Sequence, residues 1–197
     1  MTSQMVLDHL YLVIISVFVT IAAGVPIGIF AYMFKRVRKI ILWIVEVLQT
    51  IPAMAMMGII MVFLGAGKPT VIVAMVLYSL LPVASNTYVG LSEIDPAIKE
   101  VASGMGMTRM YRLFHVEIPI AFPLIFTGIR IAAVTAVGIA VFACFVGGGG
   151  IGSVIYRGIR IQNMGLILGS TFALMSMAIL LDLIMAFVEK RLYRRSK

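Results

Sequence analysis

Charged residues are scarce in this sequence, and that scarcity excludes an ordinary soluble domain. Of the 197 residues, 12% are charged and 62% are apolar, whereas a soluble domain is about one quarter charged and about half apolar. The net charge is +8, but the basic residues lie in short clusters beside apolar runs. This distribution follows the positive-inside pattern of membrane proteins and argues against nucleic acid as a partner.

Residues that form disulfides, bind metals or bind nucleotides are also nearly absent. Cys144 is the one cysteine, so no intrachain disulfide can form. His9 and His115 are isolated, which excludes a histidine-rich metal site. Gly67-Lys68 lacks the upstream glycine of a phosphate-binding loop and is followed by Pro69. We therefore expect no metal, cofactor or catalytic residue in this chain, and any use of ATP requires another subunit.

Five apolar segments are long enough to cross a bilayer, which takes about 20 residues. They are residues 10–34, 40–64, 70–91, 120–146 and 164–188. They predict an all-helical membrane protein in which residues 1–197 form one transmembrane domain. Prolines in the first four segments predict kinks; they are Pro26, Pro52, Pro82 and Pro123. The first nine residues carry no Lys or Arg, so we expect no cleavable signal peptide.

The basic residues predict the orientation in the membrane. Segments 35–39, 92–119 and 189–197 carry twelve Lys or Arg, and the segments on the other side carry three. Because basic residues collect in cytoplasmic loops, we expect the N-terminus outside and the C-terminus in the cytoplasm. Glycines 147–150 then form an outer turn. This turn has two interpretations, a flexible outer gate or a loop that needs positive φ angles. A short amphipathic piece, 153–161, follows this turn.

The longest polar interruption is segment 92–119, between the third and fourth apolar segments. Asp95-Pro96 predicts a helix start, because an acidic cap and a proline at the first helical position both favour one. Gly104 and Gly106 end this helix, and one of them supplies a left-handed cap. Thr108 caps a second helix over 109–116, and Pro119 stops it before the fourth apolar segment.

Charged residues of this segment divide into two groups. Arg109, Arg112 and His115 share one helix face, which we interpret as a contact with lipid head groups. Glu100 lies on the first helix, away from lipid. An isolated exposed glutamate contributes little to folding, whereas one held on a rigid helix can pair with a basic residue of a partner.

The same segment resembles the cytoplasmic EAA motif of ABC importers, which reads Glu-Ala-Ala, three residues, Gly, nine residues, Ile-x-Leu-Pro. Glu100-Val101-Ala102 precedes Gly106 by this spacing, and Val-Glu-Ile-Pro at 116–119 completes the pattern. The departures are apolar, and Val101 is bulkier at a packing position. The resemblance implies that this helix couples the chain to a cytoplasmic ATPase. The residues implied in coupling are Glu100, Ala102, Gly104, Gly106 and Pro119.

Almost the whole chain is similar to the five-span permeases that import quaternary-amine osmoprotectants. The matching stretches include 47–52, 78–82, 86–88, 104–108, 128–130 and 145–152. The resemblance implies the type I ABC importer fold, also found in methionine permeases, and import of glycine betaine, carnitine and choline across the inner membrane. It also implies four kinds of partner: an ABC ATPase that holds ATP and Mg²⁺, a second permease subunit, an external binding protein, and membrane lipid.

Several polar residues lie within the apolar segments. Five of them either line a translocation path or bond across helices; they are Gln49, Tyr78, Asn86, Thr87 and Tyr88. Glu46, Arg130 and Asp182 are charged residues in apolar segments, and for Asp182 we expect a structural pair with Arg130.

Three alternatives to this function stay open on the sequence. The first is an ABC permease for another small solute, such as an amino acid. The second is a standalone channel or secondary carrier, which an inverted repeat would support. The third is a membrane enzyme, which would need clustered His, Asp or Glu within the bilayer.

Overall fold

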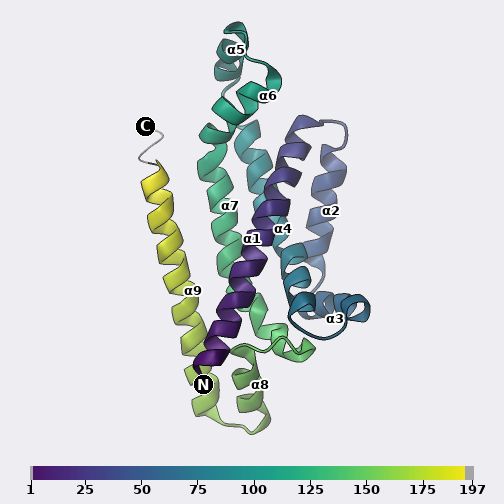
Figure 1. The fold of residues 1–197 in the computed structure, drawn as a ribbon, viewed down its shortest axis with the longest axis vertical. Helices are drawn as coiled ribbons and strands as arrows, with labels where there is room; N and C mark the ends of the chain where they lie inside the picture. Colours follow the sequence, from purple (N-terminus) through teal and green to yellow (C-terminus); the bar gives the residue numbers. More distant parts are fainter. Residues whose placement is uncertain (1, 194–197) are drawn as a thin grey trace.

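The computed structural model describes residues 2–193, and every regular element in this range is helical (Figure 1). Residue 1 and residues 194–197 lie outside the described residues, and residues 194–197 belong to the predicted basic tail. The elements are α1 Ser3–Met33, α2 Arg38–Thr50, α3 Ala53–Leu64, α4 Lys68–Ser92, α5 Pro96–Gly104, α6 Arg109–Arg112, a π turn Leu113–Glu117, α7 Ile118–Ile139, a 3₁₀ turn Ala140–Val146, α8 Gly152–Arg160 and α9 Met164–Tyr193.

The predicted all-helical membrane fold is confirmed, but the second segment is not one continuous helix. Four helical stretches are each long and apolar enough to cross a membrane. The fifth candidate is the pair α2 and α3, which meet at an angle of 100°. The break falls at Ile51-Pro52, where proline has no amide to continue the hydrogen bonding of α2. Neither α2, with 13 residues, nor α3, with 12, spans a bilayer alone.

The prediction that Pro119 stops a helix is wrong. One helical stretch runs from Arg109 to Val146, and Pro119 lies at the start of α7 within it. The π turn before α7 shifts the hydrogen-bond register, so a residue without an amide fits there at little cost. The second part of the polar segment, from Arg109 onward, and the fourth crossing therefore form one long helical stretch, which we call the rod. Helices α1, α4 and α7 also continue through Pro26, Pro82 and Pro123.

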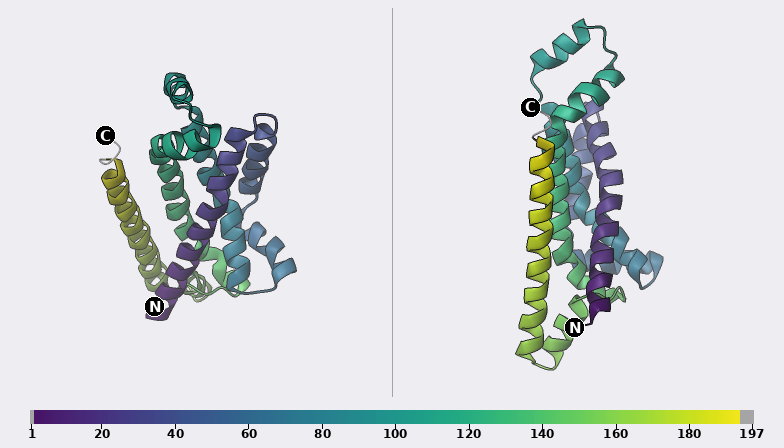
Figure 2. Two further views of the ribbon diagram at one scale, coloured as in Figure 1. Left: turned by 45° about the horizontal axis from the view of Figure 1, so that its top comes forward. Right: turned by 60° about the vertical axis from the view of Figure 1, so that its left-hand side comes forward.

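Helix α4 is the centre of the packing, with α1 and α7 along it (Figure 1). Glycines allow these close approaches. A Cβ on Gly28 of α1 would lie 2.5 Å from the carbonyl oxygen of Ala84 and 2.6 Å from Cβ of Thr87. A Cβ on Gly128 of α7 would collide with the carbonyl oxygen of Pro82. Helix α9 contacts α7 and α8 and stands apart from the rest of the bundle (Figure 2).

The two ends of the bundle differ in charge. The turn between α1 and α2, the helices α5 and α6, and the last turns of α9 lie at one end (Figure 1). We call this the basic end, because segment 35–39 and residues Lys99, Arg109 and Arg112 lie there. The N-terminus, α8 and the glycines lie at the opposite end. Gly147, Gly149 and Gly150 have φ angles of 77°, 77° and 84°, as the run of glycines predicts.

Candidate functional site

Helix α5 stands beyond the ends of the crossing helices, at the top of the basic end (Figure 2). Its start is fixed by Asp95, whose Oδ1 accepts the Ala97 amide at 2.8 Å, and by Pro96 at the first position. Its end is fixed by Gly106, whose φ of 79° permits the Met107 amide to donate to the carbonyl of Ala102 at 3.2 Å. The expected helix and caps are present, although Gly104 is the last helical residue and not the cap.

The free surface of α5 is an apolar groove with an acid on the same helix. The groove has a volume of about 380 Å³ and is lined by Ile98, Val101, Ala102, Met105, Met107 and Val116, among others. Val101 is 64% exposed and Met105 72% exposed, so most of each side chain is free of contact within the described chain. The bulkier side chain of Val101 therefore lies largely on the free surface of α5. Glu100 is exposed, and Ala102 is the buried residue that seats the helix.

Arg112 joins α5 to the start of the long rod. Its Nε donates to Oε1 of Glu117 at 2.7 Å, and Glu117 is 2% exposed. Its Nη1 donates to Ser103 Oγ and, at 3.4 Å, to the Lys99 carbonyl, both on α5. Arg112 therefore makes contacts within the chain that its interpretation as a lipid contact did not include. Sequence reasoning missed Glu117, and the signal for it was an acid that closely follows an arginine at the edge of an apolar segment.

Neighbouring cations hold α5 and α6 against the crossing helices. Arg109 Nη2 donates to the carbonyl of Met33 at the end of α1, at 2.6 Å. Lys99 Nζ donates to the carbonyl of Leu91 near the end of α4, at 2.9 Å. Each interaction places a charged group on a carbonyl that the helix end leaves without a helical donor. Helices α5 and α6 are therefore attached to three crossing helices, α1, α4 and α7.

The five polar residues suggested for a translocation path are separated by the fold. Asn86 and Thr87 each donate to a carbonyl of their own helix, at 2.7 Å to Pro82 and at 2.7 Å to Val83. Thr87 lies against α1 at Gly28, and Asn86 lies against α7 at Gly128. Tyr88 accepts a hydrogen bond from Arg38 at 2.9 Å at the basic end. Gln49 is half-buried on α2, and Tyr78 packs on the apolar cluster that also contacts Leu48 and Ile51.

The charged residues of the apolar segments form one network. Arg130 of α7 donates to both oxygens of Asp182 on α9, at 2.6 and 2.8 Å, as the sequence suggests. It also donates to Glu189 at 3.0 Å, a partner that sequence reasoning missed because residue 189 falls in the predicted tail. Glu46 is exposed on α2, and no ion pair among residues 2–193 includes it. The network fastens α9 to α7.

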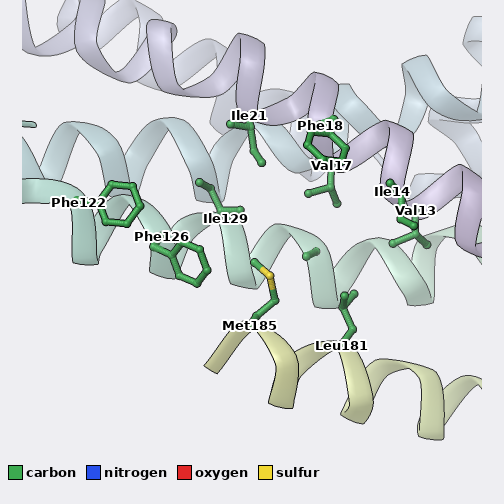
Figure 3. Close-up of a pocket in the computed structure, with 11 residues that line it drawn as sticks. Val13, Ile14, Val17, Phe18, Ile21, Phe122, Phe126, Ile129, Leu181 and Met185 are labelled. Carbon is green, nitrogen blue, oxygen red and sulfur yellow. The ribbon is translucent and has the colours of Figure 1, made fainter. Parts of the chain in front are cut away.

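The described crossing helices offer little chemistry for a metal ion or a charged solute. Among the described residues, no three His, Cys, Asp or Glu side chains are grouped so that they could hold a metal ion. An apolar groove of about 380 Å³ lies between α1, α7 and α9 (Figure 3). Phe18, Ile21, Phe126, Leu181 and Met185 line it with other apolar side chains. Such a lining offers no polar group to orient a charged solute.

Comparisons with known proteins agree with this arrangement. Residues 24–197 match the family model described as binding-protein-dependent transport system inner membrane component. The chain is 39% identical over 170 residues to the carnitine transport permease protein OpuCD of Listeria monocytogenes, covering 86% of this chain and 76% of that one. It is 42% identical over 170 residues to the choline transport system permease protein OpuBD of Bacillus subtilis, covering 86% and 75%.

A third relative and a solved structure extend the comparison. The glycine betaine/carnitine/choline transport system permease protein OpuCD of Bacillus subtilis is 38% identical over 185 residues, covering 93% of this chain and 81% of that one. The fold matches an inward-facing structure of the MetNI methionine ABC transporter with a TM-score of 0.86, at 21% identity, covering 98% of this chain and 99% of that one. The chain belongs to the family of inner membrane components of binding-protein-dependent transport systems, and it has the type I ABC importer permease fold.

Proposed function

We propose that this chain is the permease subunit of an ATP-driven importer for quaternary-amine compatible solutes. Glycine betaine, carnitine and choline are the solutes that the names of its relatives carry. The observation that carries the permease assignment is helix α5, which presents Glu100 and an exposed apolar groove beyond the crossing helices. A surface of this kind on a chain without a nucleotide-binding loop fits a role as the receiver of motion from a separate ATPase.

The partners follow from what the chain does not supply. A cytoplasmic ABC ATPase holds ATP and Mg²⁺ and docks on α5 through Glu100, the groove and the open space at Gly104. A second permease subunit, identical or a sibling, completes the pathway, and an external binding protein delivers the solute. The charge distribution supports placing the basic end in the cytoplasm and the N-terminus outside.

Transmission of motion uses the contacts of α5. When the ATPases close, α5 moves with the ATPase surface on which it docks. Arg112 lies in the helical stretch that continues into α7 and donates to Ser103 Oγ and the Lys99 carbonyl of α5, so this stretch turns with α5. Arg109 and Lys99 carry the same motion to α1 and α4. The permease pair alternates between inward- and outward-facing states, and the solute must bind the two states differently for coupling to arise.

Two of the polar residues suit the translocation path better than the others. Asn86 and Thr87 are satisfied within α4 and occupied in helix packing. Gln49 and Tyr78 are half-buried and lie on helices that meet beside the break between α2 and α3. We therefore assign the path to the flank of α2 and α4, where Tyr78 offers an aromatic face to a quaternary amine.

The docking role is tested with charge reversal on α5. In the assembled transporter reconstituted in liposomes, we expect Glu100→Lys and Gly106→Asp to abolish ATP-dependent solute uptake while the chain still inserts in the membrane. Glu93→Lys is the matched control, because Glu93 is also exposed at the basic end and precedes α5; we expect it to retain uptake. Normal uptake by both α5 variants would overturn the docking assignment.

The solute class is tested separately with labelled compounds and exchanged binding proteins. Uptake of choline, carnitine or glycine betaine with the cognate binding protein supports the assignment. If an amino acid is taken up and none of the three quaternary amines is, the assigned solute changes and the permease role remains. Solute flux without any ATPase would replace the importer assignment with a channel or secondary carrier.

A further inference from the structure

A pocket at the basic end is lined by cations from four separate elements. It has a volume of about 410 Å³ and lies between the turn after α1, α2, α4, α5 and α6. Five basic side chains line it: Lys35, Arg38, Lys99, Arg109 and Arg112. Among the described residues that line it, none is acidic. We call this site the basic pocket. The apolar groove on α5 is a different surface and shares no lining residue with it.

The cations are held in place mainly by neutral groups. Arg38 donates to the Tyr88 hydroxyl at 2.9 Å, Lys99 to the Leu91 carbonyl at 2.9 Å, and Arg109 to the Met33 carbonyl at 2.6 Å. These bonds orient the side chains without cancelling their charges. Within residues 2–193, Arg112 is the one of these five cations that makes an ion pair, with Glu117 at 2.7 Å. Five like charges are therefore gathered around one space.

Gathering like charges is unfavourable unless an anion shares the space. The donors suit a phosphate group, because guanidinium groups bind phosphate oxygens in a two-point fork and a lysine adds a compact charge. Tyr88 and Ser92 add hydroxyl groups to the lining. The pocket also lies where α1 and α4 end, which is the depth of head groups for helices that cross a bilayer.

We propose that the basic pocket binds a phosphate group, supplied by the head group of an anionic phospholipid. The occupied site joins the turn between α1 and α2 to α5 and α6, because each contributes a cation to the same anion. Lipid composition would thereby alter how freely α5 moves relative to the crossing helices. This site goes beyond the proposed function and does not depend on the solute or on the docking of an ATPase.

The test measures lipid binding by the full-length chain in detergent, using native mass spectrometry. The probes are phosphatidylglycerol, phosphatidylcholine as the lipid without net charge, and inorganic phosphate as the soluble source of the same group. The pocket variant is Lys35→Gln/Arg38→Gln. The matched control is Arg36→Gln/Lys39→Gln, which removes the same charge from the same segment at exposed positions outside the lining. The single variant Lys35→Gln serves if loss of the Arg38–Tyr88 bond impairs folding.

We expect phosphatidylglycerol to bind in preference to phosphatidylcholine, and the pocket variant to bind it at least roughly tenfold more weakly while the control changes less than about threefold. Binding of inorganic phosphate that depends on the pocket, without lipid preference, keeps the phosphate site and changes its source. Equal losses in the pocket variant and the control would overturn the proposal in favour of general surface charge. Unchanged binding in the pocket variants, or no binding of either phosphate source, would also overturn it.

Discussion

Arg112 donates to Glu117 at 2.7 Å across the π turn near the start of the longest helical stretch within residues 2–193. Glu117 is 2% exposed and the Arg112 side chain 20% exposed, so the pair is largely withdrawn from water. Because Arg112 also reaches Ser103 on α5, one side chain connects α5 to the helical stretch that continues into α7.

Replacing one member of the Arg112–Glu117 pair should destabilise the protein more than expected from the loss on replacing both members. Arg112→Gln leaves a buried carboxylate without its cation, and we expect it to lower the free energy of unfolding by about 2 kcal/mol. Glu117→Gln should do the same for the arginine. The double variant leaves no unpaired charge, so its loss should be clearly smaller than the sum of the single losses. Denaturant unfolding in detergent measures all three, and strictly additive losses would contradict the pairing.

Two glycines of α7 give a matched test of helix packing. A Cβ on Gly128 collides with the Pro82 carbonyl of α4, whereas a Cβ on Gly138 has no heavy atom within 4 Å. We expect Gly128→Ala to destabilise the protein by about 1–3 kcal/mol through overpacking. Gly138→Ala should be neutral or stabilise by up to about 1 kcal/mol, because alanine favours the helix. The measurement is the melting temperature of each variant. Equal melting temperatures would contradict the close contact of α4 and α7 at Gly128.

Gly104 and Gly106 should separate chain stability from partner docking. Gly106 has a φ of 79°, so Gly106→Ala should cost about 1–2 kcal/mol. Gly104 is helical, and a Cβ added to it would have no heavy atom within 4 Å, so Gly104→Leu should not weaken the isolated chain. If the ATPase fills that space, Gly104→Leu should nevertheless reduce its co-purification. Intact co-purification would exclude Gly104 from the interface.

Membrane orientation can be determined by labelling single cysteines. In a Cys144→Ala background, Gln162→Cys places a thiol at the end of α8 and Glu93→Cys places one at the basic end, both at exposed positions. With an impermeant maleimide we expect position 162 to react in spheroplasts and position 93 to react only after permeabilisation. The reverse pattern would place the basic end outside the cell and remove the basis for docking a cytoplasmic ATPase.

Hydropathy was sufficient to find four of the five predicted crossings as continuous helices, because a helix that spans lipid needs a long apolar run. The caps of α5 were also predictable, since Asp95, Pro96 and Gly106 act through local backbone geometry. The pairing of Arg130 with Asp182 was foreseen because charges within apolar segments need partners. These features depend on short-range rules or on one strong constraint.

Other features depended on geometry that the residue types do not determine. Pro52 divides its segment whereas Pro26 and Pro82 lie inside continuous helices, although all three lack the same amide. Pro119 is accommodated by a π turn over residues 113–117, and the residue types in this range do not predict such a turn. Arg112 was assigned to lipid because its helix face was visible in the sequence, but the partner at Glu117 depended on the tertiary fold. The path residues were grouped by polarity alone, and the fold separates them.

The 100° bend between α2 and α3 also determines what can surround the molecule on that flank. The last carbonyls of α2 have lost their helical donors, and hydrocarbon tails offer none in exchange. Lipid chains are therefore excluded from the neighbourhood of Ile51. We therefore expect that flank to border solvent or another polypeptide, and α9, on the other side of the bundle, to meet the bilayer.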